Sequence, residues 1–237
     1  MAEIHAWRSL NLIKISHVNS VYIHIECERD TAKEISEFFT FNVPGAEYTP
    51  AFKYQKWDGK IRLFNMFKRN LYAGLLPYLI KFCEDRGYGF SFQGDIHPGT
   101  SEKLNLNAVE NFMDESIKPC SGGVRISPHE HQITAIQHCL NNDRALLLSP
   151  TGSGKSLIIY SLMRHYQTMT DKKILILVPT TSLVEQMYTD FEDYSSESDW
   201  CVEENCHRIY SGKEKETDLQ VTISTWQSLY KMPPEYF

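Results

Sequence analysis

Apolar residues recur at two different spacings in the first hundred residues of the chain. In Ser20–Cys27, Val21, Ile23 and Ile25 occupy every second position, which is the period of a strand with one buried face. The same criteria predict further short strands at Leu10–Ile15, Lys60–Asn65, Leu71–Gly74 and Tyr88–Phe92.

Two segments in this region have helical spacing instead. Thr31–Phe41 follows Asp30, which we expect to be its N-cap, and Leu75–Arg86 is amphipathic and ends at Gly87, a frequent helix stop. Within Trp57-Asp58-Gly59 we expect a turn in which Gly59 takes a positive φ. Strands and helices mixed in this order predict a small α+β domain.

Strands and helices alternate in the second half of the chain. Arg144–Ser149 and Lys173–Val178 contain continuous apolar runs, which are typical of parallel strands covered on both faces. Two more strands are expected at His207–Tyr210 and Leu219–Ser224. Helices are expected at Pro128–Asn141, Ser156–Met169, Ser182–Tyr194 and from Thr225 or Trp226 onward. This alternation predicts a doubly wound α/β domain with a parallel sheet.

A polar stretch separates the two patterns. Gln93–Asn107 is rich in loop formers, Leu106–Ile117 has helical spacing, and a Pro/Gly-containing segment follows at residues 118–123. We therefore expect three parts: a small α+β domain at 1–94, a linker with a short helix at 95–123, and the doubly wound domain at 124–237.

Composition narrows the class of protein. The chain is 42% hydrophobic and 23% charged, which fits an ordinary globular protein. No apolar run reaches the length of a membrane helix and the N-terminus lacks a signal-peptide layout, so we expect a cytoplasmic protein without membrane contact. The six cysteines include no C-x-x-C pair and are expected to be free thiols; Cys201, Cys206 and His207 are too few for a structural zinc site.

The segment Ser149–Ser156 carries the clearest chemical signal. It follows the pattern G-x-x-x-x-G-K-[ST] except that Ser149 replaces the first glycine, and it lies between an expected strand and an expected helix. Backbone N–H groups there can bind phosphate, Lys155 can reach the β- and γ-phosphates, and the Ser156 hydroxyl can ligate magnesium. We expect ATP and Mg²⁺ as cofactors, Lys155 as the catalytic residue, and nucleotide binding by Thr151, Gly152, Ser153, Gly154, Lys155 and Ser156.

Gln132 lies 23 residues before Lys155 and could bind adenine through its amide. At this point a resemblance becomes visible. Ser149–Ser156 resembles motif I of superfamily-two helicases, and Arg125–Gln132 resembles their adenine-recognising segment, although His131 stands where an aromatic residue is usual. Ile176–Met187 resembles motif Ia and Val221–Leu229 resembles motif Ic.

The segment Lys53–Leu63 and the overall layout are similar to the recombination and repair helicases of T-even-type phages. The resemblance implies that the second domain is the first RecA-like motor domain and that the protein acts in the host cytoplasm. It also implies DNA contacts by Pro179, Thr180, Thr181, Thr225, Trp226 and Gln227. The partners implied are branched, duplex or single-stranded DNA and a C-terminal motor domain of the same protein.

Residues 51–69 hold six basic side chains against one acidic side chain, Asp58, with aromatic residues between them. Basic groups pair with phosphates and aromatic faces stack on bases, so we expect DNA binding here by Lys53, Lys56, Trp57, Lys60 and Arg62. The alternative is a solvated hairpin with its aromatic residues packed underneath. By resemblance, this domain would recognise branched or duplex DNA for the motor.

The sequence contains no Asp-Glu-x-His segment, which in such helicases activates the attacking water. We therefore expect an N-terminal part of an ATP-dependent DNA helicase or translocase that binds ATP weakly and does not hydrolyse it alone. Other possibilities are a small-molecule kinase, a non-catalytic DNA-binding module on a nucleotide-binding scaffold, and a motor subunit of a restriction enzyme.

Overall fold

The computed structural model describes residues 12–94, 103–142, 144–210, 212 and 214–233. They divide into two compact units, residues 1–100 and residues 101–237. The predicted strand at Leu10–Ile15 lies partly outside the described residues.

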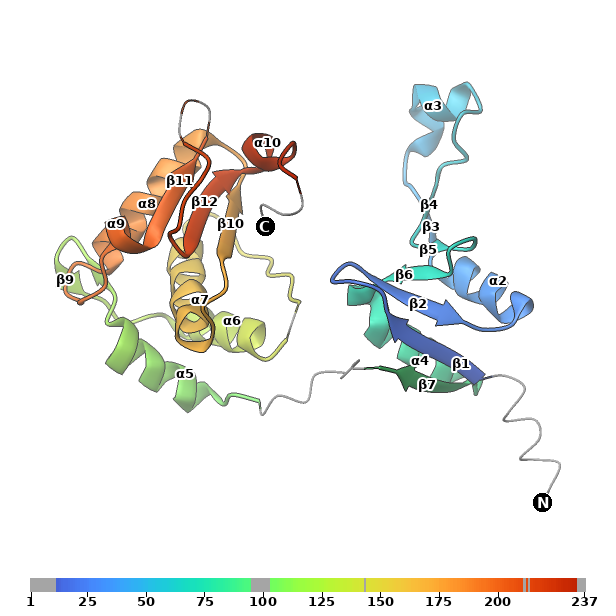
Figure 1. The fold of residues 1–237 in the computed structure, drawn as a ribbon, viewed down its shortest axis with the longest axis horizontal. Coiled ribbons are helices and arrows are strands. Elements are labelled where there is room, and N and C mark those ends of the chain that lie inside the picture. Colours follow the sequence, from blue (N-terminus) through green and yellow to red (C-terminus); the bar gives the residue numbers. More distant parts are fainter. Residues whose placement is uncertain (1–11, 95–102, 143, 211, 213, 234–237) are drawn as a thin grey trace, which may run out of the picture. The chain divides into compact units, whose positions relative to one another are not determined.

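The first unit is built on a five-stranded sheet with the order β5-β6-β2-β1-β7 (Figure 1). β1 pairs antiparallel with β2 and parallel with β7, and β6 pairs antiparallel with both β2 and β5. The strands are β1 (Leu12–His17), β2 (Tyr22–Glu26), β5 (Phe64–Asn65), β6 (Asn70–Tyr72) and β7 (Gly89–Gln93).

Two helices cover one face of this sheet. Ile13, Ile15, Ile23 and Ile25 alternate along β1 and β2 and are buried with residues of α2 (Arg29–Phe38) and α4 (Leu76–Arg86). A short 3₁₀ turn, η2 (Ala73–Leu75), precedes α4, which ends at Gly87 with a φ of 70°, as predicted. Ile23 and Ile25 of the alternation seen in the sequence therefore lie on the core face of this unit, whereas Val21, which precedes β2, is 50% exposed.

The first unit differs from the prediction at three places. The helix predicted at Thr31–Phe41 ends at Phe38, because residues 40–42 pair as a strand. The N-cap of α2 is Glu28, without a side-chain cap bond, and Asp30 lies in the first turn, where it pairs with Lys33. The expected strand Lys60–Asn65 divides at Leu63 between two sheets, because β4 (Lys60–Arg62) pairs with β3 (Thr40–Asn42) rather than with the main sheet.

The ribbon of β3 and β4 carries a small lobe at its end, formed by η1 (Ala46–Tyr48) and α3 (Pro50–Lys53) (Figure 1). We call the ribbon and lobe, residues 40–62, the arm. Its turn contains Gly59 with a φ of 73°, as predicted. A Cβ at Gly59 would lie 2.9 Å from the Cβ of Ala46 and 3.2 Å from the Phe52 ring, so the lobe packs directly against this glycine.

The second unit contains a three-stranded parallel sheet with the order β10-β12-β11. Its strands are β10 (Ile174–Val178), β11 (Cys206–Ile209) and β12 (Val221–Thr225). Its helices are α5 (Leu106–Phe112), the π-helix η3 (Met113–Ile117), α6 (Glu130–Leu140), α7 (Lys155–Met169), α8 (Thr181–Tyr194), α9 (Val202–Asn205) and α10 (Trp226–Leu229). Two short strands, β8 (Cys120–Ser121) and β9 (Val124–Arg125), form a separate hairpin.

The predicted linker contributes to the core of this unit. Val109, Met113 and Ile117 are buried in the same cluster as α6, α7 and the sheet. The Gly122 N–H also donates to the Asp193 carboxylate at the end of α8, with N···O distances of 2.8 and 3.2 Å. Most of residues 103–123 therefore belongs structurally to the second unit.

The expected strand Arg144–Ser149 is wrong. Residues 144–150 form no strand in the described structure, and Leu146 and Leu148 are 83% and 91% exposed. β10 and β11 are the two edges of the sheet, and neither of them pairs with this apolar run. The mixed α/β fold class with a parallel sheet in the second unit is nevertheless confirmed.

Candidate nucleotide and DNA sites

The predicted phosphate-binding loop, residues 149–156, runs into the start of α7, as the sequence predicted. Gly152 and Gly154 have φ values of 79° and 76°, a left-handed backbone that glycine adopts without steric cost. Gly154 is the N-cap of α7, and Lys155 and Ser156 are its first two residues. The helix start provides unpaired N–H groups and a partial positive charge, which together favour an anion.

The polar side chains of the loop form hydrogen bonds within the loop itself. The Lys155 ammonium donates to the carbonyl oxygens of Pro150 at 2.6 Å and Ser149 at 3.3 Å. The Ser149 and Ser153 hydroxyls also form a hydrogen bond. Lys155 therefore occupies the loop's own acceptors and must exchange them for phosphate oxygens when a nucleotide binds.

The Ser156 hydroxyl has a partner that the sequence did not suggest. It lies 2.9 Å from the Tyr194 hydroxyl at the end of α8, and burial is the first cause of the raised pKa of Tyr194. Tyr194 is 38 residues further along the chain, so no local pattern could have linked it to the loop. Ser156 must turn from Tyr194, or share it, to ligate a metal ion.

Gln132 reaches the loop from the first turn of α6 and is 95% buried, with an exposed fraction of 5%. Its side-chain oxygen accepts from the His129 N–H at 2.8 Å, and its amide nitrogen donates to the Ser153 carbonyl at 3.0 Å. A Cβ at Gly154 would lie only 2.0 Å from that nitrogen. His131 contacts the same carbonyl at 3.1 Å. Both side chains therefore bind the loop itself, and neither is free to receive adenine.

The residues around the loop fit the phosphates of a nucleotide. A recess of about 510 Å³ lies beside the loop, within the size range of small-molecule sites. Thr151, Gly152 and Ser153 line it, whereas Gly154, Lys155 and Ser156 do not. Among the described residues no three metal-ligating side chains gather.

The predicted DNA-binding residues of the arm surround another recess, of about 950 Å³. Lys53, Lys56, Trp57 and Arg62 line it together with Glu47, Phe52, Gln55 and Asp58, whereas Lys60 does not. The Trp57 indole N–H donates to the Lys60 carbonyl at 2.9 Å, which fixes its ring at the turn. Lys53 and Lys56 are exposed.

Arg62 is paired within the arm. Its guanidinium binds both oxygens of Asp58, and this bond is the main reason that the Asp58 pKa is lowered to about 2. The ion pair therefore persists at all ordinary pH values. Because Asp58 neutralises Arg62, the lysines of the recess are the cations best able to bind phosphate.

The second predicted DNA surface lies at the carboxyl end of the parallel sheet. Val178 of β10 stands opposite Thr225 of β12, so residues 179–181 and 226–227 leave the sheet at the same edge. Pro179, Thr180 and Thr181 are exposed, and Thr180, rather than Thr181 or Ser182, is the N-cap of α8.

The side chains at the end of β12 and at the start of α10 differ in exposure. Thr225 is 4% exposed and bonds with Ser228, whereas Gln227 is exposed and Trp226 is 56% exposed beside Tyr230. Trp226 is thus available for contact and is not part of the core. Among the described residues, no helix is long and apolar enough to cross a membrane.

Comparison with known proteins agrees with this architecture. Residues 12–93 match the family described as DNA helicase UvsW, N-terminal, and residues 125–234 match the family described as Type III restriction enzyme, res subunit. The ATP-dependent DNA helicase uvsW of Enterobacteria phage T4 is 37% identical over 232 residues, which are 95% of this chain and 44% of that protein.

Two solved structures are also similar. The crystal structure of T4 UvsW superposes with a TM-score of 0.80 at 35% identity and covers 94% of this chain and 44% of that one. The crystal structure of the UvsW helicase from Bacteriophage T4 gives 0.79 at 35% identity and covers 95% and 78%. The chain spans less than half the length of the curated relative. With both units matched in order and in fold, the chain belongs to the UvsW-like family of superfamily-two DNA helicases.

Proposed function

We propose that this chain is the N-terminal part of an ATP-dependent DNA helicase or translocase that acts on branched or recombination and repair DNA. The observation that carries the proposal is the start of α7, where two left-handed glycines place Lys155 and Ser156 at a helix N-terminus. The T4 relative is named an ATP-dependent DNA helicase, which supports the same activity for the protein to which this chain belongs.

Nucleotide binding would replace weak bonds with stronger ones. Lys155 now donates to two neutral carbonyls, and a phosphate oxygen would add the attraction between opposite charges to the hydrogen bond. Ser156 would turn its oxygen toward Mg²⁺, and the loop N–H groups would bind the phosphates, with Thr151 and Ser153 beside them. The gain is reduced by the hydrogen bonds that Lys155 and Ser156 give up, so we expect weak binding by this chain alone.

Gln132 would bind adenine only after its amide leaves the Ser153 carbonyl. Because the same amide contacts Gly154, adenine binding would loosen the loop at the point where Lys155 begins. In this proposal Gln132 links recognition of the base to opening of the phosphate site.

DNA would contact two surfaces, the arm recess and the carboxyl end of the parallel sheet. Lys53, Lys56 and Lys60 supply cations on the arm, and the exposed hydroxyls and N–H groups at Thr180 and Thr181 suit a phosphate backbone. Hydrolysis would depend on a further part of the protein, which would supply the Asp-Glu-x-His segment and the second motor domain. We expect the purified chain to show no appreciable DNA-stimulated ATP hydrolysis.

The nucleotide site is tested by titrating the chain with a fluorescent ATP analogue in the presence of Mg²⁺. Lys155→Ala should weaken binding at least about tenfold, because it removes the only loop side chain that can pair with a phosphate by charge. Lys172→Ala is the matched control, since Lys172 is an exposed lysine in the loop before β10 and should leave the affinity unchanged. Equal affinities for all three proteins would refute the proposed site.

The DNA site is tested by measuring affinity as a function of salt. Lys53→Ala with Lys56→Ala should weaken binding and reduce the slope of log K against log[salt] by about two. Lys33→Ala with Lys81→Ala removes the same charge from exposed positions on α2 and α4 and serves as the control. If both double variants change the slope equally, the arm acts only through net charge.

A restriction-type DNA translocase subunit is the second candidate, because residues 125–234 match that family. Both candidates use the nucleotide site in the same way. They differ in the first unit: residues 12–93 match the UvsW N-terminal family, whereas the match to the restriction family covers residues 125–234 and gives no reason for DNA binding by the lysines of the arm.

A further inference from the structure

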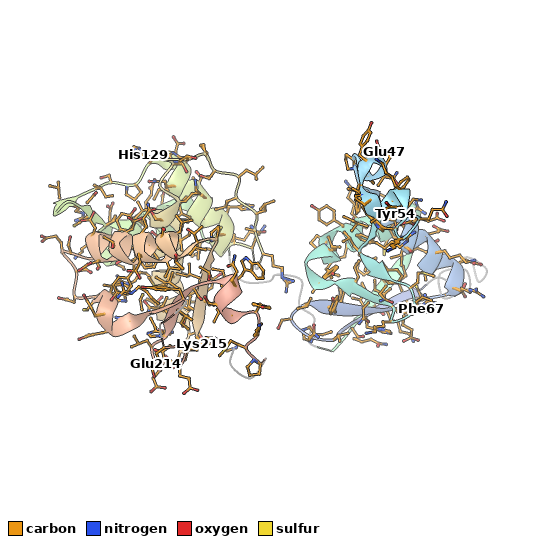
Figure 2. All side chains as sticks on the ribbon, turned by 90° about the horizontal axis from the view of Figure 1, so that it is seen from above. Glu47, Tyr54, Phe67, His129, Glu214 and Lys215 are labelled. Atoms are coloured by element: carbon orange, nitrogen blue, oxygen red, sulfur yellow. The ribbon has the colours of Figure 1, made fainter. Side chains whose placement is uncertain are left out.

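Phe67 has no contact that explains its position. It lies in the four-residue turn between β5 and β6 and is 100% exposed, the largest exposed fraction among the large apolar side chains described. Its ring takes part in none of the aromatic pairs of the described residues. Figure 2 labels it apart from Glu47 and Tyr54, which belong to the lobe at the end of the arm.

Hydrogen bonds from Asn65 and from β2 fix the turn that carries Phe67. The Asn65 side-chain oxygen accepts from the N–H groups of Phe67 at 3.0 Å and Lys68 at 2.9 Å. β2 binds the other half of the turn, because His24 contacts the Lys68 carbonyl at 3.1 Å and the Ile25 N–H donates to the Arg69 carbonyl at 2.8 Å. The ring is therefore presented at a fixed place.

The residues before and after Phe67 behave differently from it. Met66 packs against the core of the first unit, and the Arg69 guanidinium turns inward to the Cys27 sulfur at 3.6 Å. Lys68 is exposed beside the ring. The turn thus displays one aromatic face and one ammonium group together, where a simple solvent-facing turn would favour small polar residues.

This combination fits nucleic acid better than a protein surface. An aromatic ring on a rigid turn can stack on a base face, and an adjacent lysine can pair with the neighbouring phosphate. Inserting the ring between stacked base pairs requires them to separate, so a place where stacking is already interrupted is favoured. Such places occur at forks, strand ends and bulges.

We propose that Phe67 is a stacking wedge, which binds an exposed base face at an interruption in the DNA while Lys68 binds the adjacent phosphate. The proposal rests on the proposed function, because it requires that the first unit binds DNA. It adds a contact outside the arm recess and outside the sheet edge. In this proposal the β5–β6 turn is the part of the protein that distinguishes branched from continuous DNA.

The test compares two DNAs that contain the fluorescent base analogue 2-aminopurine, one with the analogue at the branch point of a fork and one with it inside a continuous duplex. Binding of the 237-residue chain should change the 2-aminopurine signal at the branch point and leave the signal inside the duplex unchanged. Phe67→Ala should abolish that change and weaken binding to the fork by about tenfold, in line with the loss of one base stack. Its affinity for the duplex should remain within about twofold.

Three further variants separate stacking from other effects. Phe67→Trp keeps a stacking face and should retain binding to the fork and the signal change. Lys68→Ala should weaken binding to both DNAs and reduce the salt slope by about one. Tyr78→Ala removes another exposed aromatic ring, from α4, and should change neither measurement. Because Phe67 is fully exposed, its replacement should leave the melting temperature unchanged, which is checked by circular dichroism.

The proposal is overturned if Phe67→Ala binds the fork as tightly as the original chain does, or if it weakens binding to fork and duplex equally. If the original chain binds neither DNA, the proposed DNA-binding function fails and the wedge fails with it. If only the lysine variants of the arm lose affinity, the DNA-binding function holds and the wedge is refuted.

Discussion

Two segments of the second unit are both continuous apolar runs but have different structures. Ile174–Val178 forms β10, in which Ile176 and Val178 are each 8% exposed, whereas residues 145–148 form no strand and leave Leu146 and Leu148 almost fully exposed. β10 has a partner on one side, β12, and the other segment has none among the described strands. A continuous apolar run therefore becomes a parallel strand only where a neighbouring strand satisfies its backbone.

β10 itself is only partly covered. It is an edge of the described sheet, and Leu175 and Leu177 on it are 41% and 53% exposed. Leu175 and Leu177 alternate with the buried Ile176 and Val178, so they lie on the other face of the sheet, which is apolar and exposed.

The largest expected difference between the two segments concerns stability. Ile176→Ala should lower the free energy of unfolding of the second unit by about 2–4 kcal/mol, because a buried side chain is removed. Leu148→Ala should change it by less than about 0.5 kcal/mol, because the side chain is already in water. Urea unfolding followed by circular dichroism measures both. Similar losses for the two variants would mean that residues 145–148 are packed in solution.

A second difference should appear in self-association. Leu146→Ser with Leu148→Ser should weaken association of the chain by at least about a hundredfold if the exposed run is a contact between copies, since burying each leucine contributes about 1.5–3 kcal/mol. Sedimentation over a range of concentrations measures this. Leu183→Ser, at another partly exposed leucine in α8, is the control. An unchanged association constant would show that the run stays solvated.

The smallest expected effect concerns the hydrogen bond between Ser156 at the start of α7 and Tyr194 at the end of α8. Tyr194→Phe should destabilise the second unit by about 1 kcal/mol, through loss of the hydrogen bond to Ser156. Because Ser156 gives up this bond on binding, the variant should bind ATP with Mg²⁺ more tightly, by up to about fivefold. A large loss of nucleotide affinity would instead show that Tyr194 positions Ser156 for the metal.

Local signals predicted most of the fold. The alternation in Ser20–Cys27, the stop at Gly87 and the left-handed Gly59 follow from backbone preferences that act over a few residues. The division of Lys60–Asn65 between two sheets could not be predicted in this way, because it depends on which distant strand each half meets. The failure at residues 144–149 has the same cause.

The candidate sites show a similar limit. The phosphate loop and its helix were predictable, because their pattern is contiguous. The Asp58–Arg62 pair was not foreseen: the sequence counted Arg62 as a free cation, and only the geometry of the turn brings the carboxylate to it. The contacts of Gln132 with Ser153 and Gly154 likewise depend on how α6 meets the loop.

The base of the arm is already closed by a hydrogen bond from the Leu63 N–H to the Phe39 carbonyl at 2.9 Å. The two chain ends that enter and leave the arm are therefore neighbours, and β3 and β4 pair only with each other among the described strands. A short turn could join Phe39 to Leu63 without disturbing the five-stranded sheet. The arm is thus an interchangeable insertion, which evolution or an engineer can lengthen, replace or remove while the domain that carries it keeps its fold.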